Sequence, residues 1–340
     1  MRQRLERLWY ADSARPALLQ PLAWAYGAVT GVRRAAYRAG WVRARRLARP
    51  VVVVGNLTVG GTGKTPLAIW LARELGAAHL KVAIVSRGYG RGSGSARNVH
   101  PDSDWRDVGD EPVILARRTG CPTMVAADRV AAARRLIARG ADVILADDGL
   151  QHLRLARDCE IVVVDGARGF GNGRLLPAGP LREPATRLRS ADIVVVNGVP
   201  EHGSLAAGVL PAGAVHMRLV AQQSVRLDGR APPCELAAFR GRRVHAVAGI
   251  GNPQRFFGEL AVHGIEVLAH PFPDHHPYTA RELTFADDLP VLMTEKDAVK
   301  CAPFANPRLW YVPVSVEFSE SDARAVRTRV LDRLRPRYGG

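Results

Sequence analysis

The sequence predicts an α/β protein whose parallel β-sheet is flanked by helices. Apolar, mostly β-branched runs alternate with helical stretches, and the first run leads through a glycine-rich turn into an amphipathic helix pattern. Each run ends in Asp, Asn, Ser or Gly, as expected of strands that are buried on both faces. Ligands bind at such strand ends. The runs are residues 51–55, 82–88, 142–149, 160–166 and 192–198.

Composition indicates a soluble protein with a real core. The chain has 340 residues, 47% of them hydrophobic, which is long enough for two domains. The cysteines lack CxxC and Cys/His ligand spacing, which argues against a disulfide framework and a zinc site. A reducing, cytosolic setting fits these cysteines, which are Cys121, Cys159, Cys234 and Cys301.

Residues 1–48 form a basic amphipathic segment. The first fifty residues hold eleven arginines and two acidic residues, a local charge of +9 within the net charge of +16. They also contain half of the chain's tryptophans. Basic flanks with interfacial aromatics suit a phospholipid headgroup layer rather than nucleic acid. These tryptophans are Trp9, Trp24 and Trp41.

Between Arg15 and Arg33 lie seventeen uncharged residues, interrupted by two prolines. This stretch is short for a membrane span, and it lacks the cleavage site of a signal peptide. We therefore expect an interfacial anchor on the cytosolic leaflet. The alternative is a basic helix that packs on the protein's own surface.

The turn after the first run predicts a phosphate-binding loop. A buried strand, a turn with free amides and a helix N-terminus together form an anion site. In this arrangement Lys64 reaches the β- and γ-phosphates, and the Thr65 hydroxyl is a ligand of Mg²⁺. Thr58 stands where the usual pattern has its first glycine. The predicted nucleotide-binding residues are Thr58, Gly60, Gly61, Thr62, Gly63, Lys64 and Thr65.

Asp147 and Asp148 close the strand at 142–149 and are predicted metal ligands with Thr65. One carboxylate at such a strand end holds the metal, directly or through water. Because neighbouring residues of an extended chain face opposite ways, we expect the pair to divide metal binding and substrate contacts. The alternative is a solvated helix cap.

The pattern of the sequence changes near Gly213, where an extended segment leads to a polar turn at 228–229. We expect a second, smaller α/β domain there. The turn at 249–251 resembles a dinucleotide motif only weakly, because its third glycine is absent. The predicted divisions are 1–48 for the membrane-interface segment, 49–215 for the phosphate-loop domain, 216–228 for a linker strand, 229–307 for the smaller domain, and 308–340 for a return strand and C-terminal helix.

Three further clusters offer groups for phosphoryl transfer to an alcohol, which needs a base near the hydroxyl and cations around the phosphoryl group. We expect a cleft between the domains, in which a carboxylate from one side orients an imidazole from the other. The clusters are Ser86, Arg87, Tyr89 and Arg91 in VSRGYGR, Asp110 and Glu111 in VGDEP, and Asp274, His275 and His276 in FPDHHPYT.

These ordered motifs resemble the tetraacyldisaccharide 4′-kinase family, the lipid A 4′-kinases of Gram-negative bacteria. The resemblance spans nearly the whole chain, and the loop with Thr58 is similar to the family's own version. It is carried by GNLTVGGTGKTP, SRGYGR, VGDEP, ADDGLQH, DGARGFGNGRLLPAGPLREP, GIGNPQRF, FPDHHPY and TEKDAVK.

The resemblance implies a P-loop kinase-like fold joined by a two-stranded linker to the smaller domain. It implies ATP- and Mg²⁺-dependent phosphorylation of the 4′-hydroxyl of tetraacyldisaccharide 1-phosphate, which gives lipid IVA in lipid A biosynthesis. The enzyme would be peripheral on the cytoplasmic face of the inner membrane. We expect the lipid substrate and the membrane surface as partners, without nucleic acid or an obligate protein partner.

The resemblance also implies roles for single residues. Asp110 and His275 would form the catalytic pair, with Asp274 beside it, and closure of the domains on ATP would bring the pair together. The motif register alone favours His275 over His276 as the base. Helpers for the acceptor or its phosphate would be Arg87, Glu111 and Gln151.

Two other classes of function compete with this interpretation. The first is a membrane-associated P-loop ATPase or GTPase switch, but the strand end at 194–202 reads VVVNGVPEH and lacks a guanine-reading NKxD element. The second is a nucleotide-dependent RNA-binding protein. That class needs a basic patch interleaved with aromatics outside the anchor, which the sequence lacks.

Overall fold

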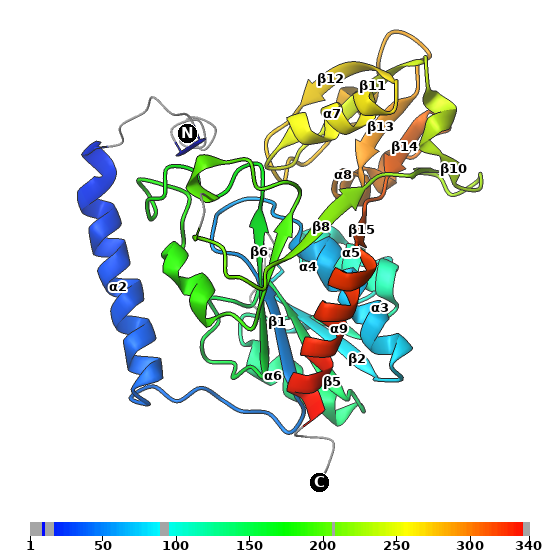
Figure 1. The fold of residues 1–340 in the computed structure, drawn as a ribbon. Helices are drawn as coiled ribbons and strands as arrows, with labels where there is room; N and C mark the ends of the chain where they lie inside the picture. Colours follow the sequence, from blue (N-terminus) through cyan, green and yellow to red (C-terminus); the bar gives the residue numbers. More distant parts are fainter. Residues whose placement is uncertain (1–8, 11–16, 89–94, 206–207, 336–340) are drawn as a thin grey trace. The chain divides into compact units, whose positions relative to one another are not determined.

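The computed structural model describes residues 9–10, 17–88, 95–205 and 208–335 (Figure 1). Packing divides the chain into two compact units, which are described separately below. Unit 1 comprises Met1–Arg87, Ala126–Arg218 and Glu317–Gly340, and unit 2 comprises Gly88–Val125 and Leu219–Val316.

The centre of unit 1 is the predicted parallel sheet. Its strands follow the order β8-β7-β6-β1-β5-β2, and each neighbouring pair is parallel. All residues of the five central strands are buried, which explains their β-branched composition. The bounds are β1 (Val51–Gly55), β2 (Val82–Ser86), β5 (Val143–Asp147), β6 (Cys159–Asp165), β7 (Ile193–Asn197) and β8 (Val215–Val220).

Helices cover this sheet. α3 contacts β1, β2 and β5, α6 contacts β2 and β5, and α9 contacts β6. Ser319 caps the N-terminus of α9, because its hydroxyl accepts a hydrogen bond from the Asp322 amide. The helical segments of unit 1 are η1 (Ala17–Leu19), α2 (Gln20–Arg38), α3 (Lys64–Ala77), α6 (Arg129–Ala138), η2 (Ala185–Ser190), η3 (Gly203–Leu205) and α9 (Glu320–Leu334).

Helix α2 packs against the rest of unit 1 through its small and polar face. The Tyr26 hydroxyl donates to the Arg182 carbonyl at 3.2 Å, and Arg34 pairs with Glu183 at 3.3 Å. Gly27 lies so close to the Leu175 side chain that an added Cβ would approach it to 2.8 Å. Within the part of the chain that the structure describes, no helix combines the length and hydropathy needed to cross a membrane.

Unit 2 contains a second sheet of six strands in the order β10-β9-β14-β13-β11-β12. Its core joins residues of β11, α7, β13 and β14, including Phe256, Phe257 and Leu260. The bounds are β3 (Arg97–Val99), α4 (Trp105–Val108), α5 (Asp110–Thr119), β4 (Thr123–Val125), β9 (Gln223–Arg226), β10 (Cys234–Glu235), η4 (Leu236–Phe239), β11 (Arg243–Ala248), α7 (Pro253–Val262), β12 (Glu266–Pro271), η5 (Ala280–Leu283), β13 (Val291–Thr294), α8 (Glu295–Cys301), η6 (Ala302–Phe304) and β14 (Leu309–Val312).

The chain passes between the units at Arg87–Gly88, at Val125–Ala126 and through two neighbouring strands, β8 and β15 (Ser315–Phe318). This agrees with the predicted α/β architecture with a two-stranded linker. Residues 88–125 belong to unit 2, whereas the predicted division includes them in the domain at 49–215. The predicted boundaries as such stay a prediction.

Candidate active site

The glycine-rich turn connects β1 to α3 as a phosphate-binding loop would. Gly63 caps α3 without a side-chain hydrogen bond and has a φ of +95°, which only glycine adopts without strain. A Cβ at Gly63 would lie 2.9 Å from Asn197 Nδ2. The first turn of the helix therefore presents backbone amides and the positive end of its dipole to an anion.

Neighbouring segments hold the loop in place. Thr58 is buried and forms an antiparallel β-bridge with Leu181, and the Val59 amide donates to the Pro180 carbonyl at 2.8 Å. Asn197, at the end of β7, donates from its amide to the Thr62 carbonyl at 3.0 Å. The side chain of Asn197 thus helps to hold this loop in place. That agrees with the absence of a guanine-reading motif in the sequence.

Asp147 and Asp148 lie beside this loop. Asp147 is the last residue of β5 and pairs in register with Val54 of β1, and its side chain is 1% exposed. Asp148 has a φ of +49°, so it is not on extended chain and the predicted alternation does not explain its direction. Its carboxylate instead turns to Lys64 at 3.6 Å and to Arg182 at 3.4 Å.

Cations dominate the electrostatics of Asp148. Burial raises the pKa of its carboxyl group, but the charges of Lys64, Arg182 and Arg129 outweigh burial and lower it to about 2. Asp148 is therefore ionised at neutral pH. The oxygens of Asp147, Asp148 and Thr65 are the hard ligands that Mg²⁺ prefers, and the residues present fit this ion.

Sequence reasoning missed two arginines of this site. The guanidinium of Arg129, which is buried, donates to the Asp148 carbonyl at 2.8 Å. Arg182 Nη1 also lies 3.5 Å from Gln151 Oε1, and Gln151 Nε2 donates to the Asn56 carbonyl at 3.2 Å. Only Arg182 could have been found from the sequence, because it lies in the motif DGARGFGNGRLLPAGPLREP. Arg129 begins a helix that no motif marks.

Unit 2 holds the predicted catalytic pair. Asp110 is the first residue of α5 and is 3% exposed, and its Oδ1 accepts a hydrogen bond from the Glu111 amide at 2.9 Å. His275 Nδ1 lies 3.1 Å from Asp110 Oδ2. His276 instead contacts Glu282 Oε1 at 2.9 Å through Nε2. It is therefore His275, and not its neighbour, that faces Asp110.

The predicted closure that would bring this pair together needs correction. Asp110 and His275 are hydrogen bonded within one compact unit, because α5 packs in unit 2 with the loop after β12. They do not come from opposite sides of an interdomain cleft. The sequence offered no signal that residues 88–125 pack with unit 2.

Three more charged groups surround the pair. Asp274 Oδ2 lies 3.7 Å from His275 Nε2. Lys296 of α8 contacts Glu111 at 3.0 Å and Asp274 at 3.6 Å. Burial raises the pKa of Asp110, but the charge of Lys296, followed by the hydrogen bond and charge of His275, lowers it to about 2.

The loop that carries His275 rests on a buried polar network. His275 has a φ of +63°, and its amide donates to the Gly249 carbonyl at 3.2 Å. The Gly249 amide in turn donates to Asp297 Oδ2 at 3.0 Å, and Asp297 pairs with the fully buried Lys300 at 2.9 Å. A Cβ at Gly249 would meet the Tyr278 hydroxyl at 2.6 Å. The turn at 249–251 thus supports the histidine loop.

The predicted helpers occupy different places. Arg87 is exposed directly after β2, and Gln151 lies with Asn56 and Arg182 in unit 1. Glu111 lies beside Lys296 in unit 2. Tyr89 and Arg91 of the same motif as Arg87 lie outside the described residues.

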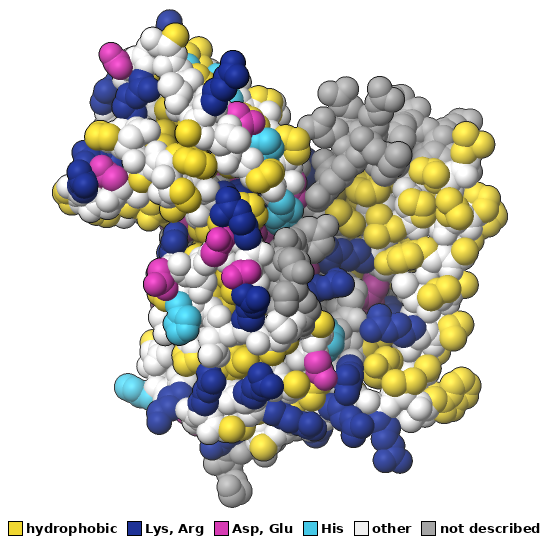
Figure 2. Space-filling model, turned by 180° about the vertical axis from the view of Figure 1, so that it is seen from behind, with side chains coloured by type: hydrophobic (Ala, Val, Ile, Leu, Met, Phe, Trp, Pro, Cys, Tyr) yellow, Lys and Arg dark blue, Asp and Glu magenta, His cyan; other side chains and the backbone are white. Residues whose placement is uncertain are grey.

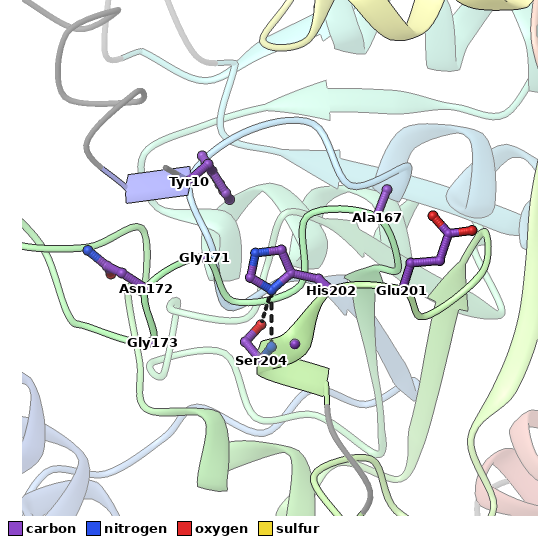
Figure 3. Close-up of a pocket in the computed structure, with 9 residues that line it drawn as sticks. Tyr10, Ala167, Gly171, Asn172, Gly173, Glu201, His202 and Ser204 are labelled. Carbon is purple, nitrogen blue, oxygen red and sulfur yellow. Dashed lines mark hydrogen bonds between the residues drawn. The ribbon is translucent and has the colours of Figure 1, made fainter. Parts of the chain in front are cut away.

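A cavity of about 610 Å³ opens at the loops that follow β6 and β7, as Figure 3 shows. His202 is fixed there, because its Nδ1 accepts from the Ser204 amide at 3.1 Å and lies 2.8 Å from the Ser204 hydroxyl. The cavity lies at the ligand-binding edge of the sheet. Four of its lining residues belong to the motif DGARGFGNGRLLPAGPLREP, to which no role was assigned from the sequence. Its lining residues are Tyr10, Ala167, Gly171, Asn172, Gly173, Glu201, His202, Gly203 and Ser204.

The parallel sheet, the loop before α3, the acidic pair at the end of β5 and the Asp–His pair define a P-loop phosphotransferase. Comparison with known proteins gives the family. The family model described as tetraacyldisaccharide-1-P 4′-kinase matches residues 15–335. The chain belongs to the tetraacyldisaccharide-1-P 4′-kinase family.

Individual relatives agree with this assignment. A tetraacyldisaccharide 4′-kinase from Alkalilimnicola ehrlichii is 54% identical over 302 residues, which cover 87% of each chain. The enzyme of the same name from Xanthomonas euvesicatoria pv. vesicatoria is 51% identical and covers 96% of this chain and 94% of its own. The solved structure of LpxK from Aquifex aeolicus in complex with ATP has a TM-score of 0.77 at 27% identity, covering 94% of this chain and 99% of that one.

Proposed function

We propose that this chain transfers the terminal phosphoryl group of ATP to the 4′-hydroxyl of a tetraacyldisaccharide 1-phosphate. The observation that carries the proposal is the presence of two complementary sites on one chain. One, beside Lys64 and Asp148, has the groups to bind phosphates and a divalent cation, and the other has the groups of a base in the Asp110–His275 pair. Relatives that are about half identical to this chain over nearly its full length bear the name of this activity.

The residues of unit 1 hold the donor. The amides of the first turn of α3 and the Lys64 ammonium bind phosphate oxygens, and Lys64 exchanges its contact with Asp148 for them. Thr65, Asp147 and Asp148 would hold Mg²⁺, which neutralises charge on the phosphates. Arg182 adds a second cation close to Lys64, because both contact Asp148.

The residues of unit 2 activate the acceptor. Asp110 is ionised, so its carboxylate accepts a hydrogen bond from Nδ1–H of His275 and fixes the tautomer in which Nε2 can take a proton. In the proposed reaction Nε2 removes the proton of the 4′-hydroxyl as its oxygen bonds to phosphorus. Asp274, whose carboxylate lies 3.7 Å from Nε2, stabilises the imidazolium that forms.

We further propose that α2 places the enzyme on the cytoplasmic face of the inner membrane, where a lipid acceptor resides. The face of α2 away from unit 1 is apolar, and Figure 2 shows hydrophobic side chains gathered along this helix. Leu22, Trp24, Val29 and Val32 are 58–69% exposed there. Arg33, Arg38 and the arginines that follow suit anionic headgroups.

Labelled ATP tests the proposed function directly. The purified enzyme is incubated with [γ-³²P]ATP, Mg²⁺ and tetraacyldisaccharide 1-phosphate in detergent micelles. We expect label in an organic-extractable product, and none when the acceptor is omitted. Release of labelled inorganic phosphate that the acceptor does not change would contradict the proposal and favour an ATPase switch.

A further inference from the structure

Lys296 has no assigned role, yet its ammonium group lies among the acidic residues around the catalytic pair. It is the second residue of α8, and its side chain is 18% exposed. Its Nζ atom lies 3.0 Å from Glu111 Oε1 and 3.6 Å from Asp274 Oδ1. One ammonium group therefore connects the first turn of α5 to the loop that carries His275.

The charges of this cluster need a cation. Asp110 and Asp274 place carboxylates beside the His275 imidazole, and Glu111 adds a third carboxylate beside Lys296. Like charges that gather in a partly buried site repel one another. Other cations close by have carboxylate partners on α8 itself. Lys300 pairs with Asp297, and Arg118 pairs with Glu295, each at 2.9 Å.

The electrostatic effect of Lys296 reaches Asp110. Burial would raise the pKa of this carboxyl group, and the Lys296 charge is the largest influence that lowers it, ahead of His275 and Lys300. In return, the charges of Glu111, Asp110 and Asp274 raise the pKa of Lys296 although burial lowers it. Lys296 therefore stays charged, and Asp110 stays ionised.

Local structure directs Lys296 toward α5. Thr294 caps α8 by accepting a hydrogen bond from the Asp297 amide at 3.2 Å, and Asp297 is anchored to the buried Lys300. These interactions fix the first turn of α8 and so the direction of the side chain between them. The motif TEKDAVK thereby combines a cap, a buried anchor and a cation that faces the catalytic pair.

We propose that Lys296 is a positioning residue for the proposed reaction. Its ammonium group ties Glu111 to Asp274 and keeps the Asp110–His275 pair in the arrangement in which His275 Nε2 can accept a proton. This inference rests on the proposed function, and it assigns Lys296 no contact with the substrate.

Several ionisable groups share this environment and can contribute to its pH dependence. α5 contributes Asp110, Glu111 and Arg118, the loop after β12 contributes Asp274, His275 and His276, and α8 itself contributes Glu295, Asp297 and Lys300.

The test compares Lys296→Met with Lys296→Arg in the labelled-ATP assay across pH. Without the positive charge the coupled carboxylate–imidazole group holds its proton more tightly, so a higher pH is needed to free the base. We expect Lys296→Met to lower kcat about 10- to 100-fold and to move the acidic limb of the kcat profile up by about one pH unit or more. The KM for ATP should stay within about twofold. Lys296→Arg keeps the charge and should keep the wild-type limb with a smaller loss of kcat.

Arg118→Met is the matched control, because Arg118–Glu295 also joins α5 to α8 and the Arg118 side chain is 17% exposed against 18% for Lys296. It should leave the acidic limb in place. The inference is wrong if Arg118→Met shifts the acidic limb of the kcat profile as Lys296→Met does. It is also wrong if the acidic limbs of Lys296→Met and Lys296→Arg lie at the same pH. If Lys296→Met does not fold, a shifted limb in Lys296→Arg overturns the inference. Failure of the wild-type enzyme to label the lipid would instead refute the proposed function.

Discussion

At the scale of residues, the distinctive feature is the hydrogen-bonded pair of Asp110 and His275. Asp110 is held ionised although it is buried, and His275 meets it at 3.1 Å from a loop with a left-handed backbone. Preorganisation of this kind lowers the cost of reaching a reactive geometry. The adjacent His276 has its own partner in Glu282 and provides an internal comparison.

The pair predicts a specific kinetic pattern. His275→Ala and Asp110→Asn should each lower kcat about 10²- to 10⁴-fold, because a positioned base contributes that much to proton transfer. The KM for ATP should change little, since these residues lie in unit 2 and the phosphate loop lies in unit 1. Steady-state kinetics measure both values. His276→Ala is the control and should retain activity within about threefold; equal losses at both histidines would contradict the assignment.

Asp110 also makes stability depend on pH. Its pKa is about 2 in the folded protein against an ordinary value of 3.8, so its contribution is fully present above pH 3.8 and is lost as the pH falls through 2. We expect this contribution to be about 2 kcal/mol of unfolding free energy. Urea unfolding between pH 7 and pH 2.5 should therefore show a weaker pH dependence for Asp110→Asn than for the wild type. If the unfolding free energies of the two proteins change with pH in the same way, the pKa of Asp110 in the folded protein has its ordinary value.

At the scale of elements, α2 reverses the usual arrangement of an amphipathic surface helix. Polar contacts such as Tyr26–Arg182 and Arg34–Glu183 face the protein, and large apolar side chains face outward. Exposed apolar surface of this extent marks an interaction site. With the adjacent arginines, the helix fits an anionic lipid interface.

Charge on the apolar face of α2 should weaken membrane binding. The double variant Leu22→Asp/Val29→Asp should bind vesicles of phosphatidylethanolamine and phosphatidylglycerol at least about tenfold more weakly, because two apolar insertions are lost. Vesicle co-sedimentation measures the binding. Val262→Asp on α7, at a valine that is 84% exposed, is the control and should bind as the wild type does. Equal binding by all three proteins would leave the membrane role of α2 without support.

At the scale of the whole molecule, the two units divide the work. Phosphate-binding groups belong to unit 1, and the base with its supporting network belongs to unit 2. Nucleotide binding and acceptor activation should therefore be separable by mutation.

Thermal unfolding tests this division. ATP with Mg²⁺ at about 100 times its Kd should stabilise the wild type by about 2.7 kcal/mol, a Tm increase of about 4 °C. Lys64→Met should lose most of this increase because a phosphate contact is removed. His275→Ala should keep it, and so should Lys81→Met, the control for loss of an exposed lysine. Loss of the increase in His275→Ala would show that unit 2 also binds the nucleotide.

Much of the fold could be read from local pattern. β-Branched runs that end in polar residues are a direct consequence of strands buried on both faces, and all five predicted runs form strands of one parallel sheet. The loop before Lys64 could also be predicted from the sequence, because a left-handed backbone position requires glycine. Arg129 and Lys296 were not identified as site residues, because an arginine or lysine on a helix is ordinary until its neighbours are known.

The sequence by itself determined the sheet, the phosphate loop and the family, since these depend on periodicity, glycine placement and ordered motifs along the chain. Only the tertiary structure decided which distant residues meet. It placed α5 in the unit of the histidine loop, chose His275 over His276 as the partner of Asp110, and brought Lys296 between Glu111 and Asp274. The physical reason is that electrostatic interactions depend on distance in space, and local sequence patterns do not specify the separation of residues that are far apart in the chain.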